Sequence, residues 1–174
     1  MLRSNNLAPA VLAVLLSTNC FVAKPARADD ASCKPLSDAM IKAASTPYHE
    51  FTTAGGESFE KIYTTKALYI GSHGHWMKTD ASPQILLDAL RQSGAAFTEC
   101  KALRTETVDG QAATVYAAHE HLASIGEDDH SQIWIGNANG LPLKSESDSQ
   151  RAGRTSHVSA HFTYGNVQPP AGVQ

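Results

Sequence analysis

The chain has 174 residues, a formal net charge of −3 and 42% hydrophobic residues. This length suits one ordinary domain, and the apolar content is enough for a packed core, which argues against a disordered chain. The sequence is mildly acidic and has no cluster of Lys and Arg, so it gives no reason to expect nucleic acid as a partner.

The first 28 residues have the three parts of a secretory signal peptide. Arg3 supplies a short positive region, and residues 7–16 form an apolar run that is shorter than the roughly 20 residues of a membrane span. Ala26 and Ala28 then occupy the small-residue positions of an A-x-A cleavage site. We expect residues 1–28 to be removed after Ala28, which leaves residues 29–174 as a single exported domain in the periplasm with no transmembrane segment.

Two other interpretations of the N-terminus stay open. Cys20 could be the acylated cysteine of a lipoprotein signal, although the preceding residues, LSTN, are bulky and polar where such a signal has small residues. The apolar run could also be an uncleaved anchor.

Removal of the signal peptide leaves two cysteines, Cys33 and Cys100. In an oxidising compartment a lone pair usually forms a disulfide, and we expect one here. Closure of a loop of this size contributes about 4 kcal/mol in the chain-entropy account. A redox or metal-binding pair is the alternative, but the sequence has no C-x-x-C spacing.

Two segments are predicted to be helical. Residues 35–47 have a capping residue at Ser37 and end on a proline. Residues 82–94 begin with Ser82 as the cap and Pro83 at the first helical position, and they end on a glycine.

Most of the remaining chain alternates between apolar and polar residues, as strands do. Residues 59–79 resemble two strands around a weak turn near Thr65 and Lys66. Residues 97–124 predict a hairpin around Asp109-Gly110, because Asp-Gly is a strong type I′ turn signal. Further strands are expected at residues 130–137, 143–150 and 155–167, before a Pro/Gly-rich tail.

Eight or nine strands, two helices and no β-α-β rhythm predict an antiparallel sheet. In the last strand Val158 and Phe162 alternate with Ser159 and Thr163, which indicates that one side of the sheet is wet. Two helices cannot cover both faces of so large a sheet. The sequence therefore predicts an α+β, mainly β fold, with a strongly curved antiparallel sheet and helices on its concave side.

Residues 133–147, IWIGNANGLPLKSES, resemble the hairpin of periplasmic lipoprotein carriers of the LolA/LolB-like superfamily. In that family an apolar strand leads into a Gly-Leu-Pro turn, and a basic residue begins the next strand. The end of the chain at residues 162–170, FTYGNVQPP, resembles the close of the last strand in the same group, and the order of elements also agrees. The hairpin positions that carry the resemblance are Trp134, Gly140, Leu141, Pro142 and Lys144.

The resemblance implies a half-open, unclosed β-barrel around a hydrophobic cavity, with the two short helices as a lid. It implies a non-catalytic carrier that holds a lipoprotein acyl chain or a similar lipid-like ligand, with an envelope protein as a further partner. A structural or interaction protein of the same fold with a filled core is the alternative. Small residues such as Ala117 and Ala160 leave room for a cavity, or else let the helices pack closely.

The candidates for lining the cavity are the large apolar and aromatic residues of the predicted strands. Val115, Ile133 and Ile135 share these stretches, and sequence alone does not separate core residues from cavity residues. The cavity candidates are Leu68, Ile70, Trp76, Tyr116, Trp134, Phe162 and Tyr164.

Eight histidines are many for this length, and two pairs are spaced by two residues, which places both rings of a pair on one face of a strand. The pairs are His73 with His75 and His119 with His121. Each pair could offer two imidazoles to a metal such as zinc, which needs three or four ligands. The alternative, a wet face or a strand end, is favoured by the alternation, so we expect neither a metal nor a cofactor.

Enzyme motifs are absent from the sequence, and we expect no catalytic activity. Ser72 and His73 are adjacent, which in a strand would point them to opposite faces and keep them from pairing.

Overall fold

The structure, a computed structural model, describes residues 31–92, 97–122 and 126–173. The predicted signal peptide, with Arg3, Cys20 and the cleavage site at Ala28, lies outside the described residues. The same holds for Gly94, the expected end of the second helix.

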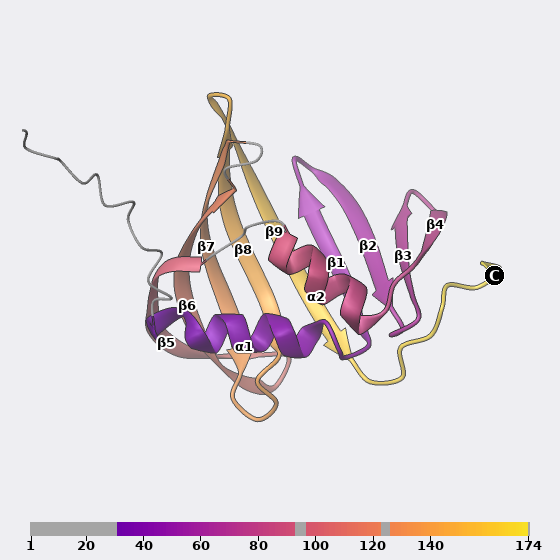
Figure 1. The fold of residues 1–174 in the computed structure, drawn as a ribbon, viewed down its shortest axis with the longest axis horizontal. Helices are drawn as coiled ribbons and strands as arrows, with labels where there is room; N and C mark the ends of the chain where they lie inside the picture. The colour runs from indigo at the N-terminus through magenta and orange to yellow at the C-terminus, as the bar shows by residue number, and fades with distance from the viewer. Residues whose placement is uncertain (1–30, 93–96, 123–125, 174) are drawn as a thin grey trace, which may run out of the picture.

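One antiparallel sheet holds the nine strands of the described residues, in the order β4-β3-β2-β1-β9-β8-β7-β6-β5. The sheet is curved and does not close, because β4 and β5 are its two edges (Figure 1). The predicted fold class, a mainly β half-open barrel with two short helices, is confirmed. The strands are β1 (Tyr48–Ala54), β2 (Glu57–Tyr63), β3 (Ala67–Ser72), β4 (His75–Asp80), β5 (Phe97–Val108), β6 (Gln111–Leu122), β7 (Glu127–Gly136), β8 (Pro142–Arg151) and β9 (Arg154–Tyr164).

Two helices, α1 (Lys34–Ala43) and α2 (Pro83–Gln92), lie on the same side of the sheet (Figure 1). A short 3-10 turn, η1 (Ala31–Cys33), precedes α1. Neither helix has the length and apolar character that crossing a bilayer requires.

The strand register assigns each side chain to one of two faces. We call the face that packs against α1 the helix face; there, Leu36 of α1 lies in one cluster with Ala118 and Ile133. We call the opposite face, which carries Val115 and Trp134, the far face. Every cross-strand pair shares a face, so this assignment extends across the sheet.

The helix α1 begins earlier than predicted. Its N-cap is Cys33 and makes no side-chain capping hydrogen bond, with Pro35 in the first turn, whereas Ser37 lies inside the helix and is exposed. The prediction of Ser37 as the cap is therefore wrong, because a proline suits the first turn and Cys33 is held in place by its disulfide. Leu36 and Ala39 are buried against the sheet.

The helix α2 starts as predicted. Pro83 is its first residue, and the Ser82 hydroxyl accepts a hydrogen bond from the Ile85 amide at 3.3 Å. A capping hydroxyl satisfies one of the amides that the first turn leaves without a helical partner.

Residues 59–79, expected to form two strands, lie in three: the end of β2, then β3 and nearly all of β4. The missed turn is His73-Gly74, where both residues have positive φ, 51° and 78°. Because His73 is in a turn, the alternation of a strand does not apply to it. The Ser72 hydroxyl consequently lies 2.9 Å from His73 Nδ1, so the expectation that these two cannot pair is wrong.

The corner between β7 and β8 carries the Gly-Leu-Pro that supports the family resemblance. Gly140 has φ +62°, and the Asn139 side chain accepts a hydrogen bond from the Leu141 amide at 3.0 Å. The Lys42 ammonium of α1 donates to the Asn139 carbonyl. The corner therefore also fixes the C-terminal end of α1 against the sheet.

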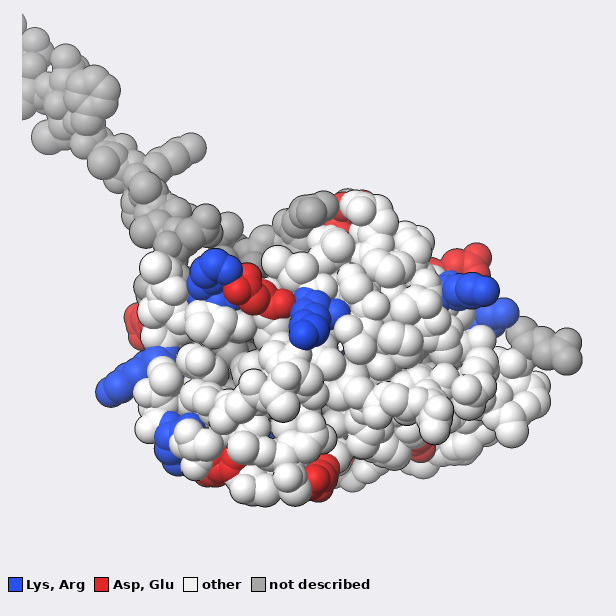
Figure 2. All heavy atoms as spheres, turned by 90° about the horizontal axis from the view of Figure 1, so that it is seen from below, with Lys and Arg blue, Asp and Glu red and all other residues white. Residues whose placement is uncertain are grey.

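Seen from below, the surface carries separate Lys and Arg side chains, most of them in the left half and some beside Asp or Glu, with a mostly uncharged expanse toward the right end (Figure 2). Phosphate-binding surfaces need clustered basic groups. On this side of the molecule the basic groups are not gathered into one cluster.

Candidate functional site

The strand β3 is covered unequally on its two faces. Tyr69 and Gly71, on the far face, are buried, whereas Leu68 and Ile70, on the helix face, are only half-buried. On the far face Tyr69 packs with Ile62, Trp76 and the C-terminal tail. The apolar residues of β3 that point toward the helices are therefore the less covered ones.

The helix α2 crosses in front of β9 and β1, beside this less covered region (Figure 1). Leu86 and Leu87 are half-buried, and Ile85 is 52% exposed. None of the described side chains of α2, residues 83–89, is fully buried. Met77, opposite Ile70 in β4, is 64% exposed and extends the apolar surface to the sheet edge. Apolar side chains of α2 and of the neighbouring strands β3 and β4 are thus left partly open to water.

Aromatic rings continue the helix face from β3 to β9. Tyr48 lies 5.5 Å from Tyr63 and 6.0 Å from Phe162, measured between ring centroids. The Tyr63 hydroxyl donates to the Ala44 carbonyl at 3.0 Å, which ties the ring beneath the end of α1. The Tyr164 hydroxyl donates to the Pro142 carbonyl at 2.6 Å. These hydrogen bonds hold the rings in fixed positions, as buried tyrosines require.

A buried carboxylate lies among these rings. Glu50 is 6% exposed and accepts hydrogen bonds from Lys61 at 2.8 Å and Thr52 at 2.6 Å. Burial raises the pKa of Tyr48 and of Tyr164, and the Glu50 charge raises both further. The two phenols therefore stay neutral, and the Glu50–Lys61 pair is a fixed polar point beside an apolar surface.

The seven cavity candidates are divided between the two faces. Five of them lie on the helix face, but Tyr116 packs beneath α1, away from β3 and β4 along the sheet. Trp76 and Trp134 lie on the far face. That the helix-face residues line a cavity stays a prediction. By register the five helix-face candidates are Leu68, Ile70, Tyr116, Phe162 and Tyr164, of which Tyr164 also packs against the cluster of Trp134.

Trp134 belongs to a filled cluster on the far face with Ala113 and Val115. Its indole Nε1 donates to Glu106 at 2.6 Å, and the Lys144 ammonium lies 4.5 Å from its ring centroid. The hydrogen bond from Trp134 and that from Arg104 lower the pKa of Glu106. Trp134 is 3% exposed, so its surroundings are those of a core residue.

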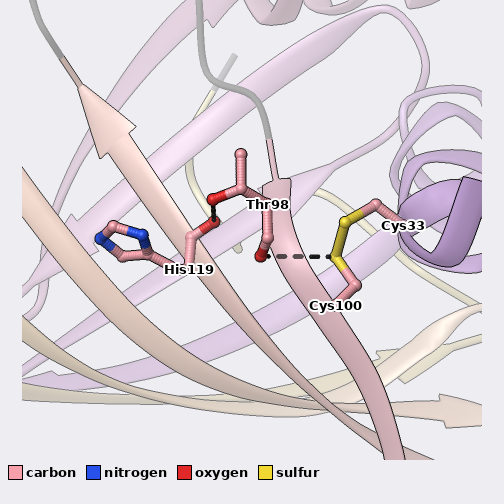
Figure 3. Close-up of a disulfide and its surroundings, with 4 residues drawn as sticks. All are labelled: Cys33, Thr98, Cys100 and His119. Atoms are coloured by element: carbon pink, nitrogen blue, oxygen red, sulfur yellow. Dashed lines mark hydrogen bonds between the residues drawn. A yellow bond between two sulfur atoms is a disulfide. The ribbon is translucent and has the colours of Figure 1, made fainter. Parts of the chain in front are cut away.

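Cys33 and Cys100 form the expected disulfide, with their Cα atoms 5.0 Å apart (Figure 3). The bridge ties η1, and with it α1, to β5. Next to it the Thr98 hydroxyl donates to the His119 carbonyl at 3.1 Å (Figure 3). Both half-cystines are buried in the cluster that α1 makes with the sheet.

The histidines of β6 to β9 lie on the far face, as their register shows. His121 Nδ1 lies 2.6 Å from Asp128, His157 Nδ1 lies 2.9 Å from Asp148, and the rings of His119 and His130 stack at 4.6 Å. The hydrogen bond with His121 lowers the pKa of Asp128. Among the described residues no three metal-binding side chains converge. His73 lies in the turn between β3 and β4, and His75 is the first residue of β4. The two are therefore not a pair spaced along one strand.

Residues of the candidate site that sequence reasoning missed are Tyr48, Glu50, Leu86 and Leu87. The two leucines lie within residues 82–94, which were predicted to be helical, but a helical pattern does not show how tightly one side of a helix packs. In β1, Tyr48 and Glu50 point to one face of the sheet, and His49 and Phe51 point to the other. Neither pair is clearly apolar, so the alternation did not indicate which face is buried.

No protein-family model matches the chain, and no curated protein sequence matches it. Among solved structures, the chain is similar to the lipoprotein LppX of Mycobacterium tuberculosis, with 10% identity over 81% of this chain and 100% of that chain, at a TM-score of 0.49. It is similar to LprF of Mycobacterium bovis, with 14% identity over 81% of this chain and 97% of that one, also at 0.49. A DUF1329 family protein of Desulfovibrio piger aligns at a TM-score of 0.28, with 9% identity over 84% of this chain and 93% of that one. Membership of the LolA/LolB-like superfamily stays a prediction.

Proposed function

We propose that this protein is an exported, non-catalytic binding protein that holds a lipid-like ligand between α2 and the helix face of β1, β3 and β9. The observation that carries the proposal is the incomplete burial of apolar side chains on both sides of this region. Leu86 of α2 and Ile70 of β3 are large apolar groups, and each stays half-buried.

The energetics favour a ligand here. Full burial of a Leu or Ile side chain is worth about 1.5–3 kcal/mol. A cluster of half-buried side chains would therefore gain several kcal/mol of burial free energy when a ligand covers it. An acyl chain recovers about 0.8 kcal/mol for each methylene group that it buries. Large apolar patches on a protein surface commonly mark such binding regions.

The polar groups beside this surface would orient the ligand. Lys61 lies opposite Ile70 in the register, its side chain is 38% exposed, and its ammonium is held by Glu50. Apolar binding sites commonly carry a few fixed polar groups of this kind. An amphiphile would place its acyl chain over Leu68 and Ile70 and its polar end near Lys61.

The sequence supports the exported location. The features of a signal peptide precede residue 29, and the Cys33–Cys100 bridge suits an oxidising compartment such as the periplasm. An envelope lipoprotein would be both a source of acyl chains and a partner in this setting.

Ligand capture tests the proposal directly. Residues 29–174 would be purified, delipidated, incubated with a bacterial membrane lipid extract, re-isolated and analysed by mass spectrometry. We expect co-purified acyl lipids and saturable binding of a fluorescent fatty acid. A protein that stays empty and does not bind the probe would instead have a filled core, which is the structural or interaction alternative.

A pair of matched variants locates the site. Leu68→Gln places an amide on the apolar surface and is expected to weaken probe binding about tenfold or more, because burying an unpaired amide costs about 1–3 kcal/mol. Leu103→Gln makes the same change at a side chain that is 42% exposed in the edge strand β5, and it should leave binding unchanged. Equal affinities of both variants would contradict the placement of the site.

A further inference from the structure

A straight row of residues crosses the far face of the first four strands. Phe51 of β1 lies opposite Glu60 of β2, Glu60 lies opposite Gly71 of β3, and Gly71 lies opposite Trp76 of β4. Residues opposite each other in an antiparallel pair have their side chains side by side on one face. The row therefore sets one carboxylate between a phenyl ring and an indole.

The indole of Trp76 lies over Gly71. A Cβ atom added at Gly71 would lie 2.7 Å from the Trp76 ring, which is closer than atoms approach without displacement. Glycine inside a strand weakens it unless something must come close to the backbone there. Here that close group is the Trp76 indole. Because Gly71 has no side chain, the ring can lie over its backbone, toward Glu60.

His49 holds the carboxylate and the phenyl ring together. Its Nε2 lies 2.9 Å from Glu60 Oε2, and its ring lies 4.1 Å from that of Phe51, between centroids. Phe51 is 45% exposed, so its ring remains open to a ligand. These contacts fix the Glu60 side chain before any ligand arrives.

A hollow of about 510 Å³ lies at this row, where β2 runs on beyond its last pair with β3. Of its lining residues, Phe51, Glu60 and Trp76 have far-face side chains by register, and the lining residues include neither Lys nor Arg. The aromatic and charged or titratable lining residues are Phe51, Phe59, Trp76, Glu57, Glu60 and His73.

We propose that this hollow binds a small organic cation that carries an alkylammonium group, such as a trimethylammonium. The faces of aromatic rings attract cations, and such rings around a quaternary ammonium recur in choline and methyl-lysine recognition. The Glu60 carboxylate and the absence of Lys and Arg from the lining residues add the same preference. The site is on the opposite side of the sheet from the lipid-binding surface proposed above, so the two ligands do not compete for one space.

The first test compares two probes of nearly identical shape on the unaltered protein. Choline chloride carries the cation, and 3,3-dimethylbutan-1-ol is its neutral isostere. The chain has two tryptophans, so its NMR spectrum has two indole N–H signals, and buried Trp134 is an internal reference. We expect choline to shift the Trp76 signal saturably at or below about 10 mM, and the neutral alcohol to bind at least about fivefold more weakly.

Equal binding of both probes would show an apolar hollow and overturn the proposal. No shift with choline would overturn it as well. Both outcomes are independent of lipid capture, since they concern other residues on another face.

Variants then test whether the Glu60 carboxylate contributes to choline binding. Glu60→Gln keeps the size and polarity of the side chain and is expected to weaken choline binding by about fivefold or more. Glu146→Gln, on the far face of β8, is the matched control, because the two side chains have similar exposure, 42% for Glu60 and 37% for Glu146. Unchanged affinity in Glu60→Gln would overturn the proposal.

Gly71→Ala tests the indole position without removing any polar group. The added methyl displaces the ring, so we expect choline binding to be lost while circular dichroism shows a folded protein. If this variant unfolds, Glu60→Gln and the probe pair still decide the question.

Discussion

Asp109, at the tip of the β5–β6 hairpin, lies 2.5 Å from the imidazole Nε2 of His161 in β9, although β7 and β8 lie between the hairpin and β9 in the sheet. The far-face residue opposite His161 is Lys144, which covers the ring of Trp134. The end of the hairpin therefore bends over the far face and helps to enclose Trp134.

The two residues of the hairpin tip should contribute differently to stability. Asp109→Asn keeps a residue that suits the positive φ of a type I′ turn but removes the charge paired with His161. Because this pair is well exposed, we expect a loss of only about 0.2–1 kcal/mol of unfolding free energy. Gly110→Ala should cost about 1 kcal/mol or more, because Gly110 has φ +78°. Urea unfolding of both variants measures the difference, and a larger loss in Asp109→Asn would contradict it.

Loss of the disulfide should lower stability more than any single change at the hairpin tip. Cys33 and Cys100 are separated by 67 positions, and the chain-entropy account gives about 4 kcal/mol for such a loop. We expect the double variant Cys33→Ser/Cys100→Ser to unfold at a clearly lower denaturant concentration. The wild type should show the same change after reduction. A reductant that leaves the wild-type midpoint unaltered would rule out a stabilising bridge.

Glu120 should make stability depend on pH. Burial raises the pKa of its carboxyl group, and the charges of Asp129 and Glu127 raise it further. Since the folded pKa is above the unfolded one, the ionised carboxylate destabilises the fold at neutral pH. This penalty fades as the pH falls through the folded pKa and is absent below the unfolded pKa of about 4.3.

We therefore expect Glu120→Gln to raise the melting temperature at pH 7.5, and the gain to shrink toward pH 4. Glu57→Gln, at an exposed position in β2, controls for the removal of one negative charge. A gain that is the same at both pH values would refute the titration of Glu120 as its cause.

Processing after Ala28 is open to direct measurement. The exported protein should begin at Asp29, as read by intact mass and N-terminal sequencing. Ala28→Arg should leave the precursor uncut, because the peptidase needs a small residue at that position. A lipid-modified Cys20 in the mature protein would replace this interpretation with the lipoprotein signal.

Turns with strong local preferences were predictable from the sequence. Asp109-Gly110 has φ values of 48° and 78°, as a type I′ turn requires. His73-Gly74 adopts similar values, but His-Gly is not one of the strong type I′ signals, which are Asn-Gly, Asp-Gly and Gly-Gly, so we infer that the β3–β4 pairing selects the turn. The extra strand was therefore missed because its turn is set by tertiary structure.

The division of residues between faces was predictable within one strand only. Alternation correctly separated Phe162 from Ser159 in β9. Whether two strands turn the same set of residues to one face depends on the exact length of the turn between them. That is why Trp76 and Trp134 were grouped with Phe162, although they lie on the opposite face.

The pairing of β1 with β9 has a consequence for how the chain becomes a whole sheet. Tyr48 lies opposite Tyr164, so the first and last strands meet at the middle of the sheet. Strands β1 to β4 pair in succession, and so do β5 to β9. The two halves are joined by the β1–β9 pair, which can form only after β9, the last strand, has been made. A chain that is synthesised from its N-terminus therefore leaves the inner edge of β1 unpaired until β9 has been made. During that interval the edge is open to aggregation or to a chaperone.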